Sequence, residues 1–100
     1  MAETPFDNIY DLSTEQLEQL DEAEEFMIRN SLGAAEKLLL QMLEVDNDCI
    51  PVLSNLGHLY GRHLSEFETA VRYYDRVLGL EPDNAWARDA RRRYMRFIEK

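Results

Sequence analysis

Residues 53–82 read LSNLGHLYGRHLSEFETAVRYYDRVLGLEP. Apolar residues recur in this stretch at intervals of three and four, which is the spacing of one face of an amphipathic helix. The pattern predicts two helices, over 50–62 and 66–80, joined by a short connection. The same spacing predicts further helices over 13–30, 34–45 and 85–98, and no segment alternates as a strand would. The sequence therefore indicates an all-α fold.

Polar residues mark the expected helix ends. Ser13 and Gln16 have the spacing of a capping box, in which each side chain accepts a hydrogen bond from the other residue's backbone N–H. Gly33 is expected to take the left-handed conformation that ends the first helix. Ser65 and Glu68 predict a second capping box at the start of the fourth helix.

The chain has the length of one small domain, with 100 residues. Residues 1–12 contain Pro5 and show no regular period, so we expect a flexible leader there. The periodic segments that follow predict a single domain over 13–100.

The chain repeats itself at an offset of 34 to 35 residues. Self-similarity at this period is typical of stacked helical hairpins. Because the offset changes between Tyr60 and Ala70, the second unit has one extra residue, which we place in the loop around His63. The matched pairs are Ala23 with Gly57, Phe26 with Tyr60, Ala35 with Ala70, Leu39 with Tyr74, Met42 with Val77, and Asn47 with Pro82.

The second unit resembles the tetratricopeptide repeat, whose pattern is a bulky residue, Leu-Gly, Tyr, Ala, an aromatic residue, a small residue and Pro. The matching residues are Leu53, Leu56, Gly57, Tyr60, Ala70, Tyr74 and Pro82, whereas Val77 departs from the pattern. In the first unit Ala23, Phe26, Ala35 and Leu39 fit, but Gln19, Glu22, Met42 and Asn47 do not. The resemblance implies a right-handed superhelix of two helix-turn-helix repeats, about 16–49 and 50–84, closed by a capping helix over about 85–99.

The resemblance also implies a function. Members of this family bind an extended peptide or a partner helix in a concave groove lined by the first helix of each pair. Carried over position by position, the groove residues are Leu17, Leu20, Glu24, Met27, Ser54, Asn55, His58, Trp86, Asp89 and Arg93. Asn55 matches an asparagine with which chaperone-binding relatives hold a peptide carboxylate. The basic residues of that clamp are replaced here by Leu20, Trp86 and Ala90, so we do not expect chaperone tails as ligands.

Charge is distributed unevenly along the chain, whose net charge is −9. Six acidic residues lie between Glu15 and Glu25, and five arginines lie between Arg88 and Arg96. An overall negative charge repels nucleic acid, so no nucleic-acid partner is expected. Acidic residues at one end of the groove favour a protein or peptide partner of basic amphipathic character.

The sequence shows no catalytic or metal-binding motif, so we expect a non-enzymatic adaptor, co-chaperone or assembly factor without a cofactor or metal. His58 and His63 are five residues apart, which does not place them on one face of an α-helix. The single Cys49 has no partner for a disulfide and suits a reducing compartment. No apolar run is long enough to cross a membrane, and we expect a cytoplasmic protein without membrane insertion.

Several features have a second interpretation. The acidic run can be a solvated helix face, Met27 can serve core packing, and Trp86 can plug the end of the array. The chain can also be a structural subunit of a larger complex, docked through its C-terminal helix. Alternatively, it can self-associate by contacts between its acidic head and its basic tail, so the oligomeric state stays open.

Overall fold

The computed structural model describes residues 9–99. The elements are the α-helices α1 Thr14–Ile28, α2 Leu32–Val45, α3 Ile50–His58, α4 Phe67–Leu80 and α5 Ala85–Ile98, with a π-helical turn, η1 Leu59–His63, that continues α3. Over these residues there is no strand, which confirms the predicted all-α class.

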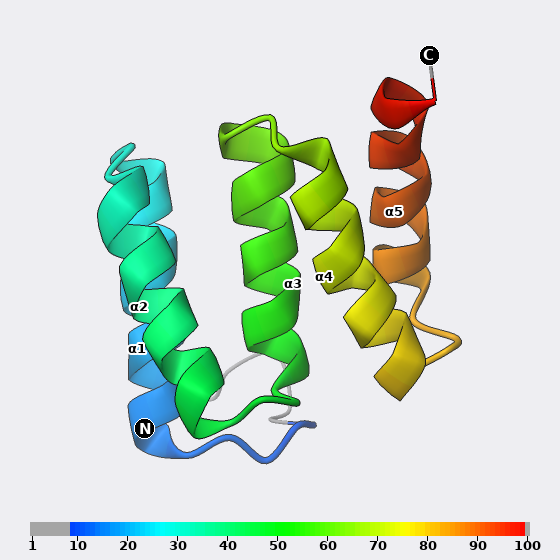
Figure 1. The fold of residues 1–100 in the computed structure, drawn as a ribbon. Coiled ribbons are helices and arrows are strands. Elements are labelled where there is room, and N and C mark those ends of the chain that lie inside the picture. Colours follow the sequence, from blue (N-terminus) through cyan, green and yellow to red (C-terminus); the bar gives the residue numbers. More distant parts are fainter. Residues whose placement is uncertain (1–8, 100) are drawn as a thin grey trace.

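The helices pack in the order in which they follow one another along the chain. α2 packs against α1, α3 against α2, α4 against α3, and α5 against α4. Figure 1 shows the resulting row, with α1 behind α2 and α5 at the other end. The domain is compact for its length, with a radius of gyration of 13.5 Å, and measures 49 × 31 × 25 Å along its principal axes.

The core runs along this row, and α3 lies at its centre. Val52, Leu53, Leu56 and Leu59 of the α3–η1 segment are fully buried, because α2 and α4 cover this segment from two sides. Three alanines are also fully buried, namely Ala23, Ala35 and Ala70. Small side chains at these positions let neighbouring helices approach closely.

The end of α1 differs from the prediction. Asn30, not Gly33, takes the left-handed conformation, with a φ of 63°. The Ser31 N–H donates to the Phe26 carbonyl at 2.7 Å, and the Asn30 N–H donates to the Met27 carbonyl at 3.0 Å. This Schellman motif satisfies carbonyls that the helix leaves without partners. The prediction for Gly33 was wrong, because α2 begins at Leu32 and contains it.

Ser65 repeats this arrangement at the end of the second hairpin's first helix. Its φ is 56°, and the N–H of the following Glu66 donates to the Tyr60 carbonyl at 2.8 Å. Glu66 is the N-cap of α4 and makes no side-chain cap bond, so the capping box predicted at Ser65 was wrong. The box predicted at Ser13 and Gln16 is confirmed, with bonds of 2.9 and 3.0 Å.

The extra residue of the second unit lies inside a helix and not in a loop. The Leu64 N–H donates to the Leu59 carbonyl at 3.1 Å, five residues back, and this i→i+5 bond defines the π-turn. Asn30 and Ser65 are 35 residues apart, whereas the acceptors Phe26 and Tyr60 are 34 apart. The π-turn Leu59–His63 therefore accommodates the added residue, because its i→i+5 bond spans one more residue than the i→i+4 bond of an α-helix.

Two glycines of the α3–η1 segment lie directly under tyrosine rings. A Cβ atom at Gly57 would lie 2.6 Å from Cζ of Tyr74 in α4, and one at Gly61 would lie 2.5 Å from Cζ of Tyr94 in α5. The two rings stack on each other, with centroids 6.2 Å apart. The absence of a side chain at both glycines thus gives α4 and α5 their close packing on the centre of the row.

We expect Gly57→Ala to lower the free energy of unfolding by about 1 kcal/mol, because overpacking against the buried Tyr74 ring outweighs the gain in helix propensity. The matched control is Gly79→Ala in α4, where a Cβ atom meets nothing within 4 Å. That change should raise stability by about 0.5 kcal/mol. Urea denaturation measures both, and an equally stabilising Gly57→Ala would contradict the close approach.

Candidate functional site

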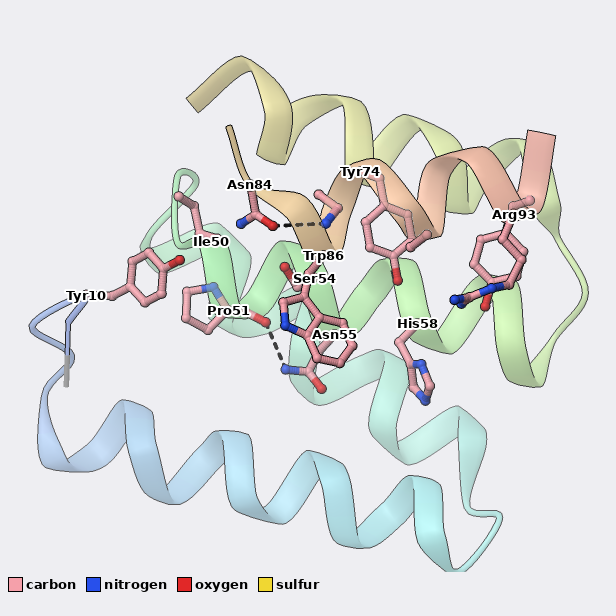
Figure 2. Close-up of a pocket in the computed structure, with 13 residues that line it drawn as sticks. Tyr10, Ile50, Pro51, Ser54, Asn55, His58, Tyr74, Asn84, Trp86 and Arg93 are labelled. Carbon is pink, nitrogen blue, oxygen red and sulfur yellow. Dashed lines mark hydrogen bonds between the residues drawn. The ribbon is translucent and has the colours of Figure 1, made fainter. Parts of the chain in front are cut away.

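The main candidate site is a hollow of about 390 Å³ between α3 and α5, which we call the α3–α5 hollow. Tyr74 and Tyr94 are buried and form its base. Figure 2 shows α3 and α5 on its two sides and Tyr10 near one end. Its walls are Ser54, Asn55 and His58 from α3, with Trp86, Ala87, Ala90 and Arg93 from α5, and its end is formed by Tyr10, Ile50, Pro51 and Asn84.

A second hollow of about 290 Å³ adjoins the first, and we call it the α1–α3 hollow. Asn55 and His58 line both hollows, so the two meet along α3. Its other residues are Glu24, Met27 and Ile28 from α1, together with His63.

The ten residues expected in the groove fall into three sets. The α3–α5 hollow brings together Ser54, Asn55, His58, Trp86 and Arg93. The α1–α3 hollow adds Glu24 and Met27. Leu17, Leu20 and Asp89 line neither hollow: Leu20 is buried in the core, and Leu17 and Asp89 are exposed.

Sequence reasoning missed Tyr10, Tyr74 and Tyr94 as residues of the site. Periodicity marks Tyr74 and Tyr94 as core residues, and only the glycines beneath them place their rings at the base of a hollow. No sequence signal places Tyr10 there, because it precedes the first helix and reaches the hollow through a contact with a distant loop.

A hydrogen-bond network holds Tyr10 at the end of the α3–α5 hollow. The Tyr10 hydroxyl donates to Oε1 of Glu81 at 3.0 Å, and Nδ2 of Asn84 donates to the same oxygen at 2.9 Å. Asn84 also caps α5, where its Oδ1 accepts from the Ala87 N–H at 2.9 Å. A flexible leader was expected over residues 1–12. Of these, residues 1–8 lie outside the part of the chain that the structure describes. Tyr10 is joined to the link between α4 and α5 by its hydrogen bond to Glu81.

The Asn55 side chain is oriented by its own helix. Its Nδ2 donates to the Pro51 carbonyl at 2.8 Å, one turn earlier. The bond is drawn in Figure 2, where the carboxamide oxygen lies on the side away from Pro51. A half-buried carboxamide held in this way offers a fixed acceptor at the junction of the two hollows.

The π-turn brings His58 and His63 together. Their ring centroids are 5.3 Å apart and the rings lie at 80° to each other. The expectation that residues five apart do not share a face was wrong, because the i→i+5 turn places His63 next to His58. Burial lowers the pKa of His58, and the positive charges of His63, Arg62 and Arg93 lower it further.

The two hollows differ in charge. Among the residues that line the α3–α5 hollow there is one arginine, Arg93, and no carboxylate. The α1–α3 hollow contains Glu24, whose pKa is raised by burial and by the neighbouring Asp21 carboxylate. The site therefore has a cationic end at α5 and an anionic end at α1.

The remaining chemistry-bearing groups lie apart from these hollows. Cys49 is buried, and burial raises the pKa of its thiol, which disfavours the nucleophilic thiolate. Over residues 9–99, no group of three or more His, Cys, Asp or Glu side chains is placed to hold a metal ion. In the same part of the chain, no helix combines the length and apolar character that crossing a membrane requires.

Comparisons with known proteins found no protein family that matches the chain and no curated protein similar to it.

We expect His58 to titrate below the ordinary histidine pKa of 6.5, since burial and three positive charges oppose its protonation. The pKa of His58 is lower in the folded protein than in the unfolded chain. The stability that its neutral form contributes is therefore complete above the unfolded pKa and is lost as the pH falls through the folded pKa. NMR titration of the imidazole protons measures the value. Arg93→Gln should raise the pKa slightly and Arg88→Gln should leave it unchanged. A pKa at or above 6.5 would contradict the described surroundings.

Proposed function

We propose that this protein is a non-enzymatic protein-interaction module that binds a peptide segment or a partner helix across α1, α3 and α5. The observation that carries the proposal is the pair of adjoining hollows along α3, which share Asn55 and His58. Seven of the ten residues expected from the family resemblance line these hollows. A surface of this kind accepts successive side chains of one extended or helical ligand.

The arrangement of the helices supports a tetratricopeptide-like array as the framework. The helices pack in chain order, as stacked hairpins do. The two hairpins recur in detail, since Asn30 and Ser65 end their first helices in the same left-handed conformation. We propose two repeats, about 16–49 and 50–84, wound as a right-handed superhelix and closed by α5.

Trp86 supports binding at the α5 side of the site. Its side chain is 88% exposed, although tryptophan is among the residues that contribute most at protein interfaces. The interpretation of Trp86 as a plug of the array does not fit this exposure, because a plug would be covered by its neighbours. An exposed indole beside a hollow is a suitable anchor for an apolar side chain of a partner.

The charges support an amphipathic ligand with a defined direction. Glu24 lies in the α1–α3 hollow and favours a basic residue of the partner at that end, as the sequence suggested.

The ionisable groups of the hollows support binding over catalysis. The ring of His58 contacts that of another histidine, and neither hollow is lined by a cysteine or by two carboxylates.

A pull-down experiment, with the immobilised protein as bait, tests this proposal. Trp86→Ala and Asn55→Ala should each reduce the recovery of the same co-purifying protein, Trp86→Ala by about 10-fold or more. The control is Arg88→Ala, which changes an exposed α5 residue outside both hollows and should have no effect. If partners bind equally well to all three variants, the groove is not the binding surface.

A further inference from the structure

We infer that α5 and the α3–η1 segment recognise an acidic stretch of the partner, with a carboxylate placed between two apolar side chains. The inference rests on the proposed function and adds the chemistry of the ligand at the α5 end. The inference assigns acidic residues of the partner to the α5 end, whereas the Glu24 end favours basic residues of the partner.

The first observation is a third hollow that extends the α3–α5 hollow along α5. It has a volume of about 450 Å³ and is lined by Gly61, Arg62, Ser65, Phe67, Arg93, Tyr94 and Phe97. Arg93 and Tyr94 line both hollows, which together we call the α5 valley. Its residues therefore form one continuous surface from Trp86 to Phe97.

The second observation is the charge of this valley. The chain carries 20 acidic residues and 11 basic ones, yet no carboxylate lines the valley, where Arg62 and Arg93 are the cationic residues. Both arginines are close enough to His58 to lower its pKa. A local positive field selects a negatively charged ligand group.

The third observation is that these two arginines are available. Among the described residues neither Arg62 nor Arg93 makes an ion pair, whereas Arg91 on the same helix pairs with Asp75. Both side chains are exposed. A guanidinium group binds a carboxylate through two parallel hydrogen bonds, so each can take one acidic side chain.

The fourth observation is the position of the exposed aromatic side chains. Trp86, Arg93 and Phe97 lie at i, i+7 and i+11 on α5, which places them along one face of the helix. Trp86 and Phe97 are 88% and 49% exposed, and a rise of 1.5 Å per residue separates them by roughly 16 Å. A ligand that covers both must present two apolar groups at this distance, with the acidic group between them.

The same observations disfavour a nucleic acid as occupant. A polyanion brings many phosphates, and the net charge of −9 would repel those that extend beyond two arginines. A peptide with one or two carboxylates limits this repulsion, because its negative charge remains within the valley. At about 0.15 M salt the distant acids of α1 are largely screened, whereas a direct guanidinium–carboxylate contact persists.

Selection from a display library of random peptides tests the inference. The peptides are about 12 residues long, which lets a helical ligand span the distance from Trp86 to Phe97. Wild-type protein is the target at about 0.15 M salt. Enriched peptides are then synthesised and titrated against the wild type, Arg93→Glu, the matched control Arg88→Glu and Trp86→Ala, with binding followed by isothermal titration calorimetry.

The expected result is enrichment of Asp or Glu flanked by aromatic or aliphatic residues. Arg93→Glu should weaken binding of these peptides by about 10-fold or more, and Arg88→Glu should change it by less than about 2-fold. Enriched peptides that are basic or uncharged, or that bind Arg93→Glu as well as the wild type, would overturn the inference.

The remaining outcomes separate the inference from the proposed function. If basic or uncharged peptides bind and Trp86→Ala abolishes their binding, the proposed function stands and the assignment of acidic ligands is wrong. If no peptide is enriched, both fail. If a single-stranded oligonucleotide binds in the same titration and Arg93→Glu prevents its binding, the valley binds nucleic acid and the inference is overturned.

Discussion

The contact of two tyrosine rings with two glycines organises the C-terminal half of the molecule. Tyr74 from α4 lies over Gly57, and Tyr94 from α5 lies over Gly61, one helical turn further along. Since the glycines lack a Cβ atom, the rings approach the helix backbone and stack on each other. This packing fixes the distance of α5 from α3, and the rings become the base of the α3–α5 hollow. The shape of the candidate site thus depends on the absence of a side chain at these two glycines.

The site combines opposite charges at two ends of a short row of helices. The carboxylate of Glu24 lies in the hollow next to α1, and Arg93 lies in the hollow next to α5, with the half-buried Asn55 between them. The uneven distribution of charge along the chain, with acidic residues in α1 and arginines in α5, matches these two ends. Such an arrangement gives a ligand a preferred direction and discriminates against the reversed one.

Much of the fold could be predicted from the sequence, because apolar residues at intervals of three and four indicate amphipathic helices. The helix ends were harder, since Ser65 suits both a capping box and a left-handed terminus, and only the bond from Glu66 to the Tyr60 carbonyl decides between them. The approach of His58 to His63 could not be predicted from an α-helical period, because it depends on the π-turn. Tyr10 reaches the site through Glu81, a contact between residues 71 positions apart that no local pattern encodes.

The π-turn has a consequence for how such a chain varies in length. An extra residue in a loop changes the path between two helices, whereas one in a widened helical turn stays within the helix. The hairpin formed by α3, η1 and α4 is one residue longer than the first at this point, yet its first helix ends in the same left-handed conformation. The length of a unit and the conformation that ends its first helix are thereby uncoupled. An insertion of this kind can add a side chain to a unit while the turn into its second helix stays the same.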